Sequence, residues 1–427
     1  MNNTHPSLAF AATIGLDWAD KKHDLWIQAA AGGPPEHQVL AQTPETLHEW
    51  AAKMRERFAN QRIALAIETT RGPVISALGA YDFIVLFPIN PASLCSYRKA
   101  FCVSGAKDDQ SDAMLLEEYV RLHAAKLRPL EPDTELTRKL AGLVENRRGL
   151  VDERTRLVNQ LHSLLKTYYP LMEVLFEDMT LPLAAQFLLK WPELASVKKA
   201  GPAALRKFFY AHHCRSDKVL AMRLGAIAQA RPLTNDPALI EPAVLKAQAL
   251  AGMLKVLDQA IAQLETKIEQ STDAHPDAPL FRSFPSAGPT MTPRLLVAFG
   301  TNRDRFASAQ EVQQFHGIAP VKKQSGQSEV IHMRYRCPKF ARQTFHENAS
   351  HVVRKEGWAK TCYEQLRARN KGHHAAVRSV AFKLMRIYFS CWKHRKCYDA
   401  AGYEKALAKH GSPLASLLKN QKPSAGE

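Results

Sequence analysis

Four carboxylates occupy places where a metal-dependent reaction could use them. They are Asp17, which ends an apolar run in IGLDWADKKHD, Glu68, which ends RIALAIE, and Asp109 and Asp112, three residues apart in AKDDQSDA. That spacing puts Asp109 and Asp112 on one helix face. Carboxylates gathered at one sheet edge repel each other unless a cation neutralises them. Mg²⁺, with Mn²⁺ as the alternative, accepts such oxygen ligands and leaves positions for phosphate and water.

Each acid alone has a simpler interpretation. Acidic residues at strand ends often cap helices or face solvent, and Asp109 could be an N-cap. The four together, in this order along the chain, favour a shared metal site over four unrelated surface residues.

The positive charge of the chain is confined to its last third. From Phe281 to Glu427 there are 26 Lys and Arg against 9 Asp and Glu, which accounts for the whole net charge of +17. Such a field attracts polyanions, of which nucleic acid is the commonest. A membrane surface is the rival partner, but it would require a basic amphipathic helix with exposed aromatic residues, and no clean one is evident.

Composition also limits the class of protein. With 46% apolar and 23% charged residues, the 427-residue chain is globular and long enough for two to four domains. Its seven cysteines form no CxxC pair, which favours a reduced protein. No apolar run approaches the ~18 residues needed to cross a bilayer. We therefore expect a cytoplasmic protein without a membrane segment.

The N-terminal part, residues 1–128, is expected to be an α/β domain. The strand candidates and helical patterns alternate in the order β-β-β-α-β-α-β-α. The strands are expected at 12–18, 23–28, 38–42, 62–68 and 83–89, and the helices at 43–60, 72–79 and 111–125. The first three strands are close enough along the chain to form an antiparallel meander.

The central part, residues 129–275, carries two heptad seams. Leu143, Leu150, Leu157 and Leu164 are spaced by seven, and apolar residues from Leu250 to Ile268 alternate steps of four and three. This pattern predicts an antiparallel coiled coil or a dimerising stalk, with a helical insertion at 181–235. Residues 276–400 are expected to form a mostly helical basic domain, and 401–427 a flexible tail.

These motifs resemble the Asp-Glu-Asp-Asp transposase family of bacterial insertion sequences. The series GLDWADKK, AIETT and KDDQSDA is similar to its acidic motifs, and Lys107 to Ala113 fits its K-T-D-x-x-D-A pattern, with Asp108 in place of the usual Thr. The resemblance implies a RuvC-like domain of the ribonuclease-H fold. In that domain Asp17, Glu68, Asp109 and Asp112 would hold the metal.

The C-terminal part resembles the same family. FPSAGPTMTPRLLVAFG is similar to its P-G-x-G-P segment, with Ser286 in place of the first glycine, and RFASAQEVQQFHGIAPVKKQSGQS is similar to its serine segment. The usual R-G-N that follows reads Arg336-Cys337-Pro338. The resemblance implies that Ser325, before Gly326, is the nucleophile. The chemistry is reasonable by itself, because a serine ester conserves the energy of the phosphodiester bond. The expected nucleic-acid contacts are Lys107, Lys322, Lys323, Gly326, Arg334, Arg336, Lys339 and Arg342.

The resemblance further implies a DNA recombinase that is guided by a structured non-coding RNA and assembles as a dimer or tetramer through the coiled coil. Two other functions remain open. A metal-dependent, structure-specific endonuclease would need the carboxylates but not Ser325. A basic nucleic-acid-binding scaffold with a degenerate ribonuclease-H domain would need neither.

Overall fold

The computed structural model describes residues 9–101 and 109–421. The chain divides into two compact units, residues 1–132 and residues 133–427, and each is described by itself.

The first unit is built around a five-stranded mixed sheet in the order β3-β2-β1-β4-β5. Strands β1, β2 and β3 form an antiparallel meander, whereas β4 and β5 run parallel to β1. The strands are β1 (Ala12–Trp18), β2 (Lys22–Ala29), β3 (Glu36–Ala41), β4 (Ile63–Ile67) and β5 (Ile84–Pro88). All five strands expected from the apolar runs are present.

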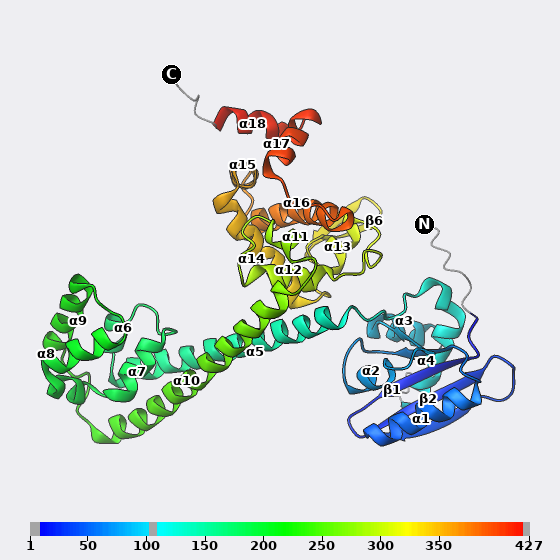
Figure 1. Ribbon diagram of the computed structural model, residues 1–427, viewed down its shortest axis with the longest axis horizontal. Helices are drawn as coiled ribbons and strands as arrows, with labels where there is room; N and C mark the ends of the chain where they lie inside the picture. Colours follow the sequence, from blue (N-terminus) through cyan, green and yellow to red (C-terminus); the bar gives the residue numbers. More distant parts are fainter. Residues whose placement is uncertain (1–8, 102–108, 422–427) are drawn as a thin grey trace. The chain divides into compact units, whose positions relative to one another are not determined.

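Helices cover both faces of this sheet (Figure 1). Apolar side chains of α1 (Pro44–Arg57) and α2 (Pro73–Leu78) share a core with Ile14 and Leu16. The other face packs against α3 (Pro91–Phe101) and α4 (Asp109–His123), where Ala66 and Phe87 meet Leu116. A short 3-10 turn, Ala124–Lys126, follows α4. The α3 helix was not expected from the sequence.

The second unit begins with two long helices that lie side by side, α5 (Glu135–Tyr168) and α10 (Pro237–Asp273) (Figure 1). They are antiparallel: Arg147 pairs with Glu265, and Arg154, further along α5, pairs with Asp258, which is earlier in α10. The pair corresponds to the two heptad seams.

Four shorter helices gather at the end of this pair where α5 stops and α10 starts. They are α6 (Leu171–Leu175), α7 (Pro182–Lys190), α8 (Leu194–Ala211) and α9 (Asp217–Gln229). Their apolar residues, including Phe187 and Phe209, form one core with Leu161 and Leu254 of the long helices. A helical insertion was expected at 181–235, between the two heptad seams, and α7, α8 and α9 lie there; α6 precedes it.

The rest of the second unit is mostly helical and has its own core around Trp358, Tyr388 and Trp392. Its helices are α11 (Ala278–Arg282), α12 (Met291–Phe299), α13 (Ala309–Phe315), α14 (Lys339–Lys355), α15 (Gly357–Ala368) and α16 (His373–His394). One exposed hairpin, β6 (Val321–Ser325) with β7 (Ser328–His332), interrupts them. The sequence had not suggested this hairpin.

The expectation of a flexible tail at 401–427 is corrected for the residues up to 421. Helices α17 (Ala400–Lys409) and α18 (Pro413–Gln421) occupy this stretch, and Leu414 is buried in the core of the second unit. The many small and polar residues of this stretch made its apolar face, which includes Leu407 and Leu418, difficult to recognise in the sequence.

None of the described helices combines the length and the apolar composition that a crossing of a bilayer requires.

Candidate functional site

Two of the four predicted metal ligands end neighbouring parallel strands. The register of β1 and β4 pairs Leu16 with Ile67, so Asp17 and Glu68, one residue further on each chain, are neighbours at the same sheet edge. Asp17 is still in β1, and Glu68 directly follows β4. Both side chains are partly buried and take part in interactions. The carboxyl edge of these strands therefore carries two adjacent carboxylates.

Helix α4 brings the other two carboxylates to this face of the sheet. It packs so closely over β1 that a Cβ on Gly15 would overlap the Ala113 carbonyl oxygen. The Thr13 hydroxyl donates to Glu117 at 2.5 Å. As β1 proceeds from Thr13 to Gly15, its contacts on α4 move back from Glu117 to Ala113. Helix α4 therefore runs antiparallel to β1, with its first turn at the Asp17 end.

That first turn contains Asp109 and Asp112, which differ in their surroundings. Asp112 is buried and forms an ion pair with Arg98 of α3. Asp109 is 61% exposed, with the Lys22 ammonium 3.9 Å from its carboxylate. Both also suit the positive end of the α4 dipole. The protein thus brings Asp112 to the sheet edge with a cationic partner and leaves Asp109 at the surface.

A fifth carboxylate, Asp24, lies at the same edge and was missed from the sequence. It is directly opposite Asp17 in the β1–β2 register and is only 5% exposed. Its partners are His37, 2.8 Å from one oxygen, and Lys22, 3.4 Å from the other. Lys22 therefore lies between Asp24 and Asp109. Counting back symmetrically from a four-residue turn at 19–22 would have paired Trp18 with His23 and Asp17 with Asp24.

The donor chemistry at this edge fits a hard cation, because every candidate ligand is a carboxylate oxygen. Among the residues described, no three His, Cys, Asp or Glu side chains are gathered closely enough to hold an ion as they stand. Lys22 and Arg98 supply positive charge to Asp109 and Asp112 instead. The metal site therefore stays a prediction, supported by the strand register and the placement of α4.

Ser325 lies in the second unit, at the end of β6 and at the tip of the exposed hairpin. It pairs with Ser328 across a two-residue turn that begins at Gly326, whose φ is +56°. Nothing lies within 4 Å of the position where a Cβ on Gly326 would be. The side chain of Ser325 is exposed. Its hydroxyl is therefore accessible to a large substrate, as a nucleophile must be.

The hairpin is flanked by a packed turn that joins the GIAP segment to the segment around Cys337. Gly317 of GIAP has a φ of +71°, and a Cβ there would overlap the Cys337 thiol. The Arg342 guanidinium donates to the Arg334 carbonyl oxygen at 3.0 Å and closes the same turn. The segment around Cys337, which departs from R-G-N, is thus packed directly on the glycine of GIAP.

Apart from Lys107, the predicted nucleic-acid contacts lie in this hairpin or in the segment that follows it, up to Arg342. Lys322, Lys323, Gly326, Arg336 and Lys339 are exposed, whereas Arg334 and Arg342 are partly buried in the turn. Lys322 also pairs with Glu329 across the hairpin at 2.8 Å.

Large apolar side chains are exposed beside them, at Val330, Ile331 and Tyr335, the last being 70% exposed. Lys107 and Asp108, the first residues of the third acidic motif, lie outside the described residues.

Ser286, which stands where the resemblance expects a glycine, keeps a glycine-like backbone. Its φ is +58°, in the left-handed region. The turn is fixed by Asn348, which donates to the Pro285 carbonyl at 3.2 Å and accepts from the Tyr388 hydroxyl at 2.7 Å. The Ser286 hydroxyl is buried without a hydrogen-bond partner among the described residues.

Comparison with known proteins matches both ends of the chain. Residues 14–170 match a family model described as "Transposase", of the DEDD type of IS110, and residues 278–364 match one described as "Transposase IS116/IS110/IS902 family". The two matched stretches contain the acidic motifs and the serine hairpin, respectively.

Relatives that match most of the chain agree with these family matches. The chain is 28% identical to "Mini-circle putative transposase for IS117" from Streptomyces coelicolor over 90% of this chain and 94% of that protein. It is 29% identical to the uncharacterized 43.6 kDa protein of insertion element IS110 from the same organism, over 70% of this chain and 75% of the relative. A third relative, from insertion element IS900 of Mycobacterium paratuberculosis, is 24% identical over 69% of this chain and 73% of that protein. The chain belongs to the IS110 family of insertion-sequence transposases, which are enzymes that cut and rejoin DNA.

Proposed function

We propose that this transposase cuts and rejoins DNA through a covalent bond between Ser325 and a DNA phosphate. The observation that carries the proposal is the place of Ser325: its hydroxyl is exposed at a hairpin tip, beside a glycine in the left-handed region. Lys322 and Lys323 on the same strand supply positive charge for the phosphates.

The chemical step is an exchange of esters at phosphorus. The Ser325 oxygen attacks the phosphorus, and the bond from phosphorus to one sugar oxygen breaks. The serine proton passes to a general base, and the departing sugar oxygen takes up a proton. A hydroxyl from another DNA strand then reverses the step, so that joining needs no external energy source.

The acidic edge of the first unit would hold Mg²⁺ through Asp17, Glu68, Asp109 and Asp112, with Asp24 opposite Asp17 on the neighbouring strand. Bound Mg²⁺ would neutralise phosphate oxygens. The sheet order β3-β2-β1-β4-β5, with an antiparallel meander followed by parallel strands, supports a ribonuclease-H-like, RuvC-like domain.

A structured non-coding RNA would supply sequence recognition. The confined charge of +17 suits backbone contacts, and an exposed aromatic side chain such as Tyr335 suits stacking on an unpaired base. RNA that co-purifies with the protein and derives from the flanks of its element would support this assignment. Full DNA cutting by protein freed of RNA would refute it.

Assembly of more than one copy would use the α5–α10 pair as a coiled coil. Helix α10 carries Leu245, Met253 and Val256 on its exposed side, each more than half exposed. These residues follow steps of eight and three, which places them on one stripe away from the buried Leu250 and Leu254.

The experiment that tests the serine assignment compares two variants of one hairpin. Ser325→Ala should abolish strand cutting on DNA that contains the element ends, while DNA binding stays unchanged. Ser328→Ala is the matched control, since Ser328 is the exposed cross-strand partner, and it should keep activity. Metal-dependent cutting that survives Ser325→Ala would instead identify an endonuclease that uses the carboxylates alone.

A further inference from the structure

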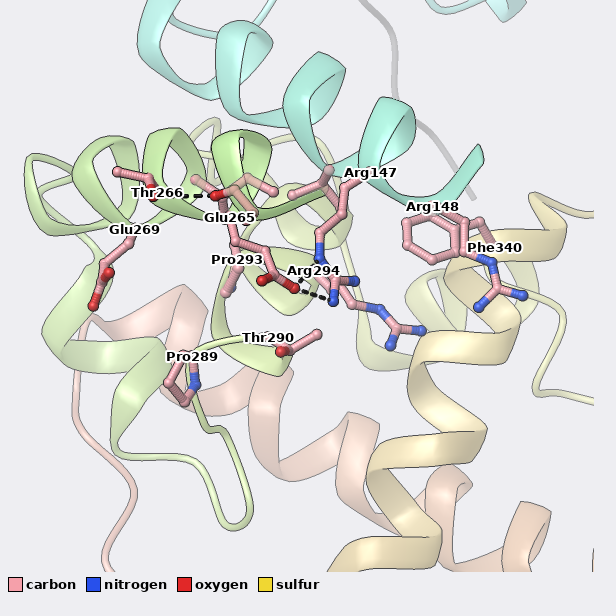
Figure 2. Close-up of a pocket in the computed structure, with 13 residues that line it drawn as sticks. Arg147, Arg148, Glu265, Thr266, Glu269, Pro289, Thr290, Pro293, Arg294 and Phe340 are labelled. Carbon is pink, nitrogen blue, oxygen red and sulfur yellow. Dashed lines mark hydrogen bonds and ion pairs between the residues drawn. The ribbon is translucent and has the colours of Figure 1, made fainter. Parts of the chain in front are cut away.

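A second basic site lies at the junction of helices α5, α10, α12 and α14 in the second unit. A pocket of about 520 Å³ opens there, and three arginines line it: Arg147, Arg148 and Arg294. Figure 2 shows their guanidinium groups at one end of the pocket, with Phe340 beside them. None of these residues belongs to the serine hairpin or to the acidic edge.

Arg294 is the deepest of the three. Its side chain is only 9% exposed, its Nε donates to the Thr344 hydroxyl at 3.0 Å, and its Nη1 pairs with Glu347 at 2.7 Å. Its Nη2 is buried without a hydrogen-bond partner among the described residues. A buried donor left unsatisfied costs roughly 1–3 kcal/mol. A ligand with an acceptor oxygen at this point would remove that cost.

The other two arginines are held in place by carboxylates that leave a donor free for a ligand. Arg147 uses Nε and Nη2 on Glu265, at 2.9 and 2.6 Å. Arg148 uses the same two nitrogens on Asp152, at 3.0 and 2.8 Å. Among the residues that the structure describes, the Nη1 groups of both arginines have no acceptor, so they remain as donors.

The three cations also act on each other. Burial lowers the pKa of Arg294, and the charges of Arg148 and Arg147 lower it further, against the opposing effect of Glu347. The Phe340 ring stabilises both neighbours, with the Arg294 and Arg148 guanidinium carbons 4.8 and 5.9 Å from its centroid. An anion bound among them would relieve their mutual repulsion.

Two carboxylates line the same pocket, so their positions decide its preference. Glu265 is already paired with Arg147. Glu269 lies toward the opposite end of the pocket from the three guanidinium groups in Figure 2. The arginine end is therefore free of an unpaired carboxylate.

We propose that this pocket binds a phosphate group of a nucleic-acid backbone. Planar guanidinium groups with spare N–H donors match phosphate oxygens, and a transposase of net charge +17 works on polyphosphate chains. The contact would hold the nucleic-acid backbone against the part of the α5–α10 pair that contains Arg147 and Glu265. The inference rests on the family's action on DNA and does not depend on the chemistry proposed for Ser325.

The test uses full-length Ser325→Ala protein, so that binding is measured without cutting. Thr290, an exposed residue that lines the pocket and makes no capping hydrogen bond with its side chain, is changed to Glu or to Gln. The two side chains have the same size, and only Glu adds a negative charge. Thermal unfolding of both variants is compared first. The midpoint of Thr290→Glu should be no lower than that of Thr290→Gln, because Glu adds a negative charge near the three arginines and at the N-terminus of α12.

Binding is then measured with a labelled DNA duplex and a labelled RNA hairpin over a series of salt concentrations. Thr290→Glu should weaken binding of at least one of them by about tenfold relative to Thr290→Gln, and the salt slope should fall by about one. The probe that is affected identifies DNA or RNA as the source of the phosphate.

Equal affinities of the Glu and Gln variants for both probes would overturn the proposal. A second result would also overturn it: inorganic phosphate raises the unfolding midpoint of Thr290→Gln but not of Thr290→Glu, while the two variants bind both nucleic acids equally well. The pocket would then bind a free anion and not a nucleic-acid backbone. Failure of Ser325 to form an adduct would leave these binding results standing.

Discussion

Ser286 has the left-handed backbone conformation that favours glycine, although it carries a side chain. The left-handed region costs a non-glycine residue roughly 1–2 kcal/mol. The turn is nevertheless kept, because Asn348 and the stacked rings of Phe284 and Tyr388, 4.1 Å apart, hold the segment from both sides. The strain is therefore balanced by packing.

Ser286→Gly is predicted to stabilise the second unit by about 1 kcal/mol. The change removes the left-handed strain and an unpaired buried hydroxyl, which outweigh the greater freedom of glycine in the unfolded chain. Hydrogen exchange of the α12 and α16 amides measures the effect. Ser286→Ala, which removes only the hydroxyl, should gain less. A loss of protection in Ser286→Gly would contradict this account.

The part of the candidate site that could be predicted from the sequence is the pair of acidic residues at strand ends. Asp17 and Glu68 could be paired because both end apolar runs that the α/β pattern makes parallel neighbours. Asp24 was not anticipated, because its burial depends on the β1–β2 register and its neighbours Lys22 and His23 make the segment look like a polar turn. The pairing of Asp112 with Arg98 could not be anticipated either, since α3 was not expected.

At the scale of elements, the packing of α4 on β1 depends on one glycine. Gly15 leaves room for the backbone of α4 at Ala113 and Glu117. Because the Asp109–Asp112 turn belongs to the same helix, this contact also sets where those acids lie relative to Asp17.

Gly15→Ala is predicted to destabilise the first unit by roughly 3 kcal/mol or more, because the added methyl group has no space and must displace α4. DNA cutting should fall with it. Gly142→Ala is the control, since Gly142 lies in α5 with nothing within 4 Å of its added Cβ, and it should be neutral or slightly stabilising. Equal unfolding midpoints of the two variants would refute the close packing.

Glu117, on the buried side of α4, should make the stability of the first unit against unfolding depend on pH. Burial raises its pKa above the ordinary 4.5, against the opposing effects of Thr13 and Arg121. The folded state therefore binds more protons than the unfolded state, and its contribution to stability falls as pH rises from about 4.5 through the raised pKa.

Urea unfolding between pH 4 and 7 checks this, with Glu117→Gln as the comparison. The wild-type protein should lose stability relative to Glu117→Gln as the pH rises. Parallel curves for the two proteins would show that the Glu117 carboxyl does not titrate differently in the folded state.

The elements that sequence reasoning missed have identifiable causes. Residues Asn90–Ala92 have the composition of a loop, yet the Asn90 side chain accepts from the Ala92 amide at 2.9 Å and Pro91 begins α3, a regular helix start. The β6–β7 hairpin has no buried side chain to give an alternating pattern. Its only sequence signal was the glycine of the turn.

At the scale of the whole molecule, the exposed stripe of α10 is predicted to join copies of the chain. Replacing Leu245, Met253 and Val256 together by Gln should lower the molecular mass found by light scattering, since the apolar contact is lost. Met222→Gln, which removes an exposed apolar residue of α9, should leave the mass unchanged. An unchanged mass in the triple variant would exclude this stripe as the interface.

The charge distribution and the acidic motifs indicate a nucleic-acid enzyme, and the proposed chemistry assigns the nucleophile to Ser325. The most direct measurement incubates purified protein with its element-end DNA, the flanking transcript and Mg²⁺, denatures the mixture, and maps any protein–DNA adduct by mass spectrometry. A phosphodiester-linked nucleotide on the peptide that contains Ser325, absent with Ser325→Ala and present with Ser328→Ala, is the predicted result. Cut DNA without any adduct, or an adduct on another residue, would contradict the account.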